Sequence, residues 1–197
     1  MSMRKTGEEA LQFNGKDLGL RLCVFWSWGF SDLLDNTLRG SYSEFIVAAA
    51  LGIDLSEPRV NWEPWDLTFR SEQGDIHVEV KSASYLQTWE QERPSAIQFS
   101  IRPAIRWTAT HGYTGEQHRQ SDVYVFCVFT ETERLKANPM QLKSWDFYVL
   151  PTRVLDEHYG AQKTIRLSSL LRIHPERVDF PGLKDAVLRS MAFNERP

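Results

Sequence analysis

The sequence is poor in cysteine and in net positive charge, and it has no long hydrophobic run. Only two cysteines, Cys23 and Cys127, occur in 197 residues, and both stand inside apolar stretches. This pattern predicts two buried, reduced thiols in an intracellular protein rather than a disulfide framework. The formal net charge of −3 argues against a protein that binds nucleic acid through bulk charge.

Targeting and membrane segments are also missing from the pattern. The first nine residues, MSMRKTGEE, are polar and largely charged, unlike the start of a secretory signal peptide. No apolar run approaches the roughly 20 residues that a membrane-spanning helix needs. We therefore expect a cytoplasmic protein with no membrane partner. A local basic groove is still compatible with the composition, because 23 residues are Lys or Arg and 16 of these are Arg.

What is present favours one α/β domain over residues 1–197. The apolar content of 42% and the charged content of 25% are ordinary for a globular protein. The nearly continuous apolar run 122–130 is typical of a strand buried on both faces of a sheet. A strand at 144–150 and a closing helix at 183–191 predict a C-terminal strand–helix extension over 140–197. We expect a mixed central β-sheet flanked by helices.

The N-terminal third predicts a polar arm followed by two helices. Residues 1–19 have the composition of a loose arm, and the aromatic stretch 20–30 predicts a core helix, with a base-stacking surface as the alternative. The next helix begins at Ser41 and ends at Gly52. In this interpretation Glu44 either closes a capping box with Ser41 or is the one acid of an apolar helix, directed at a polar site.

The stretch 65–82 predicts a β-hairpin. Residues 70–75 carry turn chemistry, and the following residues alternate apolar with polar. A hairpin closed symmetrically about Glu72 and Gln73 opposes Asp66 to Glu79 and places Lys81 on the same face. Like charges directly opposed destabilise a sheet, so this patch requires a counter-charge, for which a hard divalent cation is suited.

Two further segments could border the same polar patch. Residues 96–101 alternate like a third strand, and Gln98 and Ser100 line the hairpin's polar face if this strand joins it. Basic groups in the Gly-containing segment 102–121 suit phosphate contact, with an ordinary solvated loop as the alternative. The predicted nucleic-acid contacts are Gln98, Ser100, Arg102, Arg106 and Arg119.

The order of these features resembles the PD-(D/E)XK nuclease superfamily, the restriction-endonuclease-like fold. The resemblance covers about residues 40–130 and includes an acid, Asp66, followed on the next strand by Glu79-Val80-Lys81. Glu44 matches the acid often found on the first core helix. The sequence departs from the usual Pro-Asp, because Trp65 separates Pro64 from Asp66. Glu63 is the substitute acid if the register differs.

The resemblance implies a Mg²⁺-dependent endonuclease, with Mn²⁺ as an alternative ion and double-stranded DNA as the substrate. It implies that Asp66, Glu79 and the Val80 carbonyl bind the metal. It also implies that Lys81 orients water and stabilises charge, and that Glu44 holds a water or a second ion. Relatives of the restriction type often act as homodimers.

Two alternatives remain at this stage. One is a non-catalytic nucleic-acid-binding or scaffold protein that keeps the fold. The other is a hydrolase of another class that uses His77, which shares the strand face of Glu79. Nothing else in the sequence supports this second alternative, because there is neither a nucleophile elbow nor a Gly-rich phosphate loop.

Overall fold

A five-stranded mixed sheet forms the centre of the computed structural model, which describes residues 3–59, 63–104, 107–108, 112–113 and 117–192. In sheet order the strands are β11 (Glu176–Val178), β9 (Trp145–Pro151), β8 (Val123–Phe129), β4 (Gly74–Ser84) and β3 (Leu67–Ser71). Strands β4 and β8 run parallel, whereas the other neighbours are antiparallel. Every residue of β8 is buried, which confirms the predicted central strand.

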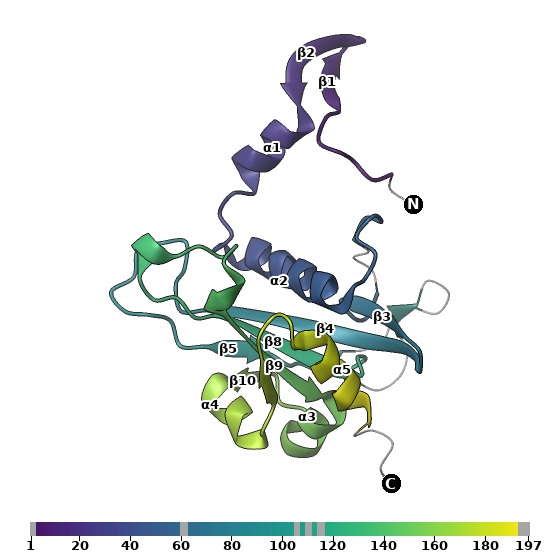
Figure 1. Cartoon of the computed structure of the whole chain (residues 1–197), viewed down its shortest axis with the longest axis vertical. Helices are drawn as coiled ribbons and strands as arrows, with labels where there is room; N and C mark the ends of the chain where they lie inside the picture. Colours follow the sequence, from purple (N-terminus) through teal and green to yellow (C-terminus); the bar gives the residue numbers. More distant parts are fainter. Residues whose placement is uncertain (1–2, 60–62, 105–106, 109–111, 114–116, 193–197) are drawn as a thin grey trace.

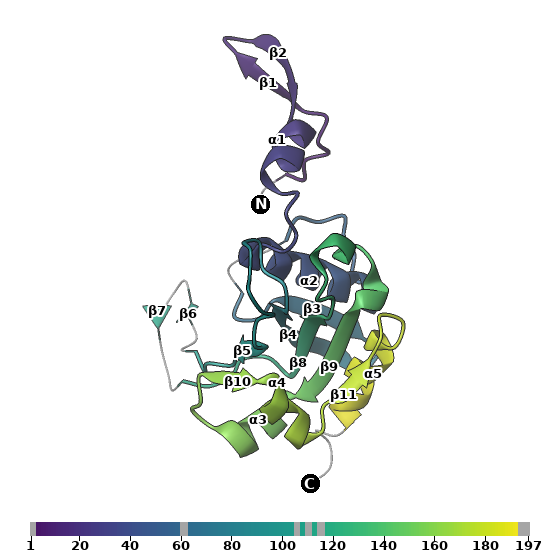
Figure 2. The same cartoon turned by 90° about the vertical axis from the view of Figure 1, so that its left-hand side faces the viewer.

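Helices cover both faces of this sheet, as Figures 1 and 2 show. Helices α2 (Asn36–Leu51) and α5 (Leu183–Ala192) pack on one face through a core that includes Val47, Val78 and Val187. The opposite face, which includes Phe126 and Leu155, is covered by α3 (Thr152–Tyr159) and α4 (Leu167–Leu170). None of the described helices is long and apolar enough to cross a membrane.

Short elements complete the chain. Strands β5 (Gln98–Ser100) and β10 (Thr164–Arg166) form a separate antiparallel pair, and β6 (Trp107–Thr108) pairs with β7 (Gly112–Tyr113). Three 3₁₀ helices are η1 (Arg134–Lys136), η2 (Leu142–Ser144) and η3 (Leu171–Ile173). The prediction that the strand over 96–101 could join the hairpin was wrong, because β5 pairs with β10 instead.

Helix α2 begins earlier than the sequence pattern predicted. Its N-cap is Asp35, whose carboxylate accepts hydrogen bonds from the backbone N–H groups of Thr37 at 2.9 Å and Leu38 at 3.0 Å. Ser41 therefore lies inside the helix, and the capping box with Glu44 is wrong. The predicted end is confirmed, because Gly52 takes the left-handed conformation with φ of 73° that terminates helices.

The N-terminal residues differ most from expectation. Instead of a loose arm, β1 (Ala10–Phe13) and β2 (Lys16–Arg21) form a hairpin that leads into α1 (Leu22–Gly29). The predicted core helix is also wrong, because α1 has no buried residue. Cys23 is exposed and only Cys127 is buried, so the burial predicted for both thiols holds for one. In both views this unit stands away from the rest of the chain (Figures 1 and 2).

The hairpin of β3 and β4 has the predicted register. Thr68 opposes His77 and Arg70 opposes Asp75, with a two-residue turn at Glu72 and Gln73. Continued by one residue, this register sets Asp66 opposite Glu79. The ladder itself stops at Leu67, so that beyond Val78 β4 pairs with only one strand of the sheet, β8. The candidate site lies where β4 loses this neighbour.

Candidate active site

The free edge of β4 positions Asp66. The Asp66 backbone N–H donates to the Val78 carbonyl at 3.1 Å, which is the last link between the two strands. The next N–H on that edge belongs to Val80, and it donates to Asp66 Oδ2 at 2.8 Å. In a strand the N–H and C=O of one residue point to the same side, so the Val80 carbonyl also faces this edge. Asp66 and this carbonyl therefore lie together.

Lys81 connects the two acids of the hairpin. Its ammonium donates a hydrogen bond to Glu79 Oε1 and lies 3.9 Å from Asp66 Oδ2. The three side chains are each only about one-fifth to one-quarter exposed, at 19% for Glu79, 23% for Asp66 and 25% for Lys81. The structure thus brings Asp66, Glu79 and Lys81 together in one half-buried cluster, in which a single ammonium is shared between two carboxylates.

Glu44 reaches the same region from α2. It is buried, and its carboxylate accepts hydrogen bonds from Nε and NH2 of Arg59, which lies on the segment between α2 and β3. Burial raises the pKa of Glu44, and the negative charge of Asp66 raises it further, against the opposing effect of the Arg59 hydrogen bond. Glu44 is therefore part of the electrostatics of the cluster.

Burial also raises the pKa of Glu79. The Lys81 ammonium lowers this pKa, whereas the carboxylates of Asp66 and Glu44 raise it again. The net direction is upward, which means that one ammonium does not fully compensate the desolvation and the repulsion among three acids. This is an electrostatic arrangement that an additional cation would relieve.

A cavity of about 580 Å³ opens beside the cluster, between α2, the segment that follows it, and β3. Glu44, Arg59 and Asp66 line it, whereas Glu79 and Lys81 lie outside its lining. Glu63, the substitute acid, is exposed and also lines this cavity. The cavity therefore gives access to the cluster from the side of Asp66.

His77 and Trp65 form one wall of this cavity. Their rings stack with centroids 3.7 Å apart, and His77 Nδ1 lies 3.2 Å from Asp122 Oδ2. The same carboxylate accepts the His77 backbone N–H at 2.8 Å. Asp122 thereby fixes the orientation of the imidazole and holds the beginning of β8 against β4.

The predicted nucleic-acid contacts do not form one surface. The prediction that Arg119 contacts nucleic acid is wrong. Its side chain is buried and donates hydrogen bonds to the Ile101 carbonyl at 2.9 Å and to the Asp156 carboxylate. Gln98 and Ser100 are exposed on β5, outside the central sheet. Arg102 is exposed, whereas Arg106 lies outside the described residues.

Arg59 and Asp122 were not predicted as site residues from the sequence. Arg59 stands in a proline-bounded segment without periodicity, so nothing in the pattern indicated which acid it would meet. Asp122 begins a run that was interpreted only as a buried strand. Its position relative to His77 follows from the parallel pairing of β4 with β8, which starts at Val78 and Val123.

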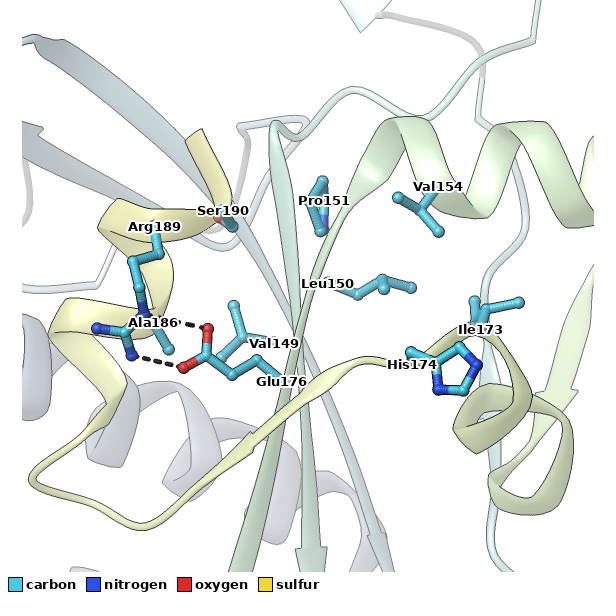
Figure 3. A pocket seen from close by; sticks show the side chains of 10 residues that line it. All are labelled: Val149, Leu150, Pro151, Val154, Ile173, His174, Glu176, Ala186, Arg189 and Ser190. Atoms are coloured by element: carbon cyan, nitrogen blue, oxygen red, sulfur yellow. Dashed lines mark hydrogen bonds and ion pairs between the residues drawn. The ribbon is translucent and has the colours of Figure 1, made fainter. Parts of the chain in front are cut away.

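A second cavity, of about 350 Å³, lies at the C-terminal end of β9, against α3, η3 and α5. Figure 3 shows its apolar lining from Leu150, Val154 and Ile173, with the ion pair of Glu176 and Arg189 beside it. It contains none of the predicted site residues.

The donor set of the cluster fits a small hard cation. Within the described ranges, no three His, Cys, Asp or Glu side chains gather into a metal-binding group. The chain offers instead two adjoining carboxylates, Asp66 and Glu79, and the Val80 carbonyl. Mg²⁺ typically takes one or two protein carboxylates and keeps several waters, and it does not need a cage made wholly of side chains.

The match to a protein-family model agrees with a nuclease. A family model described as bacteriophage T4 endonuclease IV matches residues 29–169, a segment that contains Glu44, Asp66, Glu79 and Lys81. No curated protein sequence matches the chain. Among solved structures, a bacterial homing endonuclease is similar with 21% identity and a TM-score of 0.37, over 66% of this chain and 76% of that chain. Because the family model covers well over half of its length, the chain belongs to the bacteriophage T4 endonuclease IV family of nucleases.

Proposed function

We propose that this chain is a Mg²⁺-dependent endonuclease that hydrolyses double-stranded DNA at a site of the PD-(D/E)XK type, on a restriction-endonuclease-like core. The observation that carries the proposal is the convergence of Asp66, Glu79 and Lys81 at the free edge of β4. The family supplies the class of reaction, and the cluster supplies residues suited to it.

Asp66, Glu79 and the Val80 carbonyl would hold the ion, with Mn²⁺ as a substitute. The Val80 N–H fixes Asp66 at the strand edge, so this carboxylate is oriented before an ion arrives. When bound, Mg²⁺ acts as a Lewis acid toward the phosphate and makes a water molecule more acidic. The raised pKa of Glu79 indicates an electrostatic need that this cation would meet.

Lys81 would act on the substrate directly. In the metal-free protein its ammonium compensates Glu79 and Asp66. Once a cation takes over that compensation, the ammonium can donate to the attacking water and to a phosphate oxygen, where negative charge develops in the transition state. Glu44, held by Arg59 on the cavity wall, would accept a hydrogen bond from a water near Asp66.

The test is cleavage of supercoiled plasmid and linear duplex DNA by the purified chain with Mg²⁺, Mn²⁺ or chelator. We expect Asp66→Ala and Lys81→Ala to lower the rate by about 100-fold or more, as the loss of a transition-state electrostatic contact does. The matched control is Lys143→Ala, which removes an exposed lysine distant in the chain from the cluster. Full activity in both site variants would refute the proposal. DNA binding without cleavage in either metal would support the non-catalytic alternative.

A further inference from the structure

The N-terminal unit, residues 3–30, exposes an apolar surface for which the rest of the described chain provides no cover. Its large hydrophobic residues range in exposure from 39% for Trp26 to 84% for Trp28. From β1 onward the exposed members are Leu11, Phe13, Leu18, Leu20, Val24, Phe25, Trp26, Trp28 and Phe30. In two perpendicular views the unit projects beyond α2 rather than lying against the sheet or its helices (Figures 1 and 2). We call residues 3–30 the arm.

The arm is a preformed unit. The Leu22 N–H donates to the Glu9 carbonyl at 3.0 Å, and the Cys23 N–H donates to the Gly7 carbonyl at 2.9 Å, which ties the beginning of α1 to the segment before β1. Gly7 has φ of 97° and lies so close to the Trp26 ring that a Cβ there would stand 3.0 Å from it. Since the arm is ordered by its own contacts, docking it costs little conformational entropy.

The amount of exposed aromatic surface matches a protein interface. The five exposed aromatic side chains of the arm, scaled by their exposed fractions, present roughly 400–700 Å². The four aliphatic side chains add to this area. A stable interface buries about 800 Å² per partner, whereas the largest apolar patch of an ordinary monomer is about 300–600 Å². The arm alone therefore provides nearly one side of a standard interface.

The charges of the arm nearly balance, with Arg4, Lys5, Lys16 and Arg21 opposed by Glu8, Glu9 and Asp17. This balance favours a protein partner over nucleic acid. Helix α1 has the sequence LCVFWSWG and contains no charged residue. Arg21, at its beginning, is paired with Asp17 at 2.9 Å. Single-stranded nucleic acid is bound by aromatic residues set in a positively charged groove, because the backbone phosphates must be neutralised. The aromatic face of α1 offers no such groove, so the base-stacking alternative is disfavoured.

The arm presents both a groove and projecting aromatic rings. A shallow groove of about 190 Å³ lies between the hairpin and α1, lined by Leu11, Leu20, Arg21, Val24, Phe25 and Trp28. Trp28, which lines this groove, and Phe13 on β1 are the most exposed aromatic residues of the arm. In a two-fold dimer one patch meets its own copy, so a surface with both a groove and projecting rings can fill itself.

We propose that the arm is a dimerisation element, in which the apolar faces of two arms from two copies of this chain pack against each other. This goes beyond the nuclease site and does not depend on it, because no residue of the arm belongs to the cluster at β4. The homodimer implied by the resemblance to restriction-type enzymes would then be built mainly by residues that precede the family match, which begins at residue 29.

Analytical ultracentrifugation of the full chain over a range of concentrations tests this directly. The wild type should sediment with twice the 22.9 kDa mass of one chain. Trp28→Glu should raise the dimer dissociation constant about 100-fold or more, because a two-fold interface repeats each central aromatic residue. Circular dichroism should be unchanged, since the Trp28 side chain is mostly exposed.

Met140→Glu is the matched control, because Met140 is an exposed apolar residue of the main body, at 67% exposure. It should dimerise like the wild type. A monomeric wild type, or a Trp28→Glu dimer as tight as the wild type, would overturn the proposal. Loss of the dimer in Met140→Glu would place the contact on the body instead. Loss of DNA affinity in Trp28→Glu with no change in mass would make the arm a base-stacking surface, and would equally overturn it.

Discussion

Arg119 provides a quantitative test of the fold around the β5–β10 pair. The sequence assigned it to a loop that contacts nucleic acid, whereas its side chain has 0% exposure. The guanidinium donates to the Ile101 carbonyl at 2.9 Å, to the Gln162 carbonyl at 3.3 Å and to the Asp156 carboxylate. One side chain thus connects three segments that are distant in sequence. We expect Arg119→Ala to destabilise the protein strongly.

The magnitude follows from the bonds that are lost. A hydrogen bond to a charged group contributes about 1.5–3 kcal/mol, and Arg119→Ala removes two such bonds to main-chain carbonyls. Asp156 is half exposed, so water replaces that partner and the ion pair adds little. The expected loss is about 3–6 kcal/mol, or a fall in Tm of roughly 6–24 °C for a domain of this size.

Urea denaturation followed by tryptophan fluorescence measures this loss. The matched control is Arg102→Ala, an exposed arginine one residue after Ile101, which should change the stability by no more than about 0.5 kcal/mol. A loss below about 1 kcal/mol for Arg119→Ala at an unchanged m-value, or equal losses for both variants, would refute the structural role. If Arg102 contacts phosphate as predicted, Arg102→Ala should weaken DNA binding while leaving the stability unchanged.

Two further predictions concern the acids of the cluster. The pKa of Glu79 is raised in the folded state, so its contribution to stability is present below the unfolded value near 4.5 and is lost as the pH rises through the folded pKa. Glu79→Gln should therefore raise Tm in metal-free buffer at pH 7 and give no gain at pH 4; a lower Tm at pH 7 would contradict the sign. Glu44→Gln should reduce cleavage without loss of stability, whereas Asp35→Ala, at the true N-cap of α2, should cost about 1 kcal/mol. A comparable loss of stability in Glu44→Gln, with cleavage retained, would mean that Glu44 has a structural role only.

The sequence predicts those parts of the fold that depend on local periodicity. The alternation of Ile76, Val78 and Val80 and the two-residue turn were enough to set the register of the hairpin. The apolar run in β8 and the Pro151 boundary of β9 similarly determined the centre of the sheet. In each case the pattern that predicts the element lies within a few residues of sequence, although the packing that stabilises it involves distant segments.

The failures have different physical causes, of which one is a missed local cap and another is contact over long separations in sequence. The beginning of α2 was misplaced because Gly40 and Ser41 suggest a boundary, although Asp35 already caps the helix. Arg119 looked exposed because its acceptors are 18 and 43 residues away. The aromatic residues of α1 suggested a core, but the described chain brings no element to cover them.

The most direct test of the central proposal, one metal-dependent hydrolytic site at the free edge of β4, is the anomalous scattering of a crystal soaked in Mn²⁺. The proposal predicts an anomalous peak within coordination distance of both Asp66 and Glu79, and loss of that peak in Asp66→Ala. If Mn²⁺ supports DNA cleavage in solution but the peak lies elsewhere, or persists unchanged in Asp66→Ala, the assignment of the site is wrong.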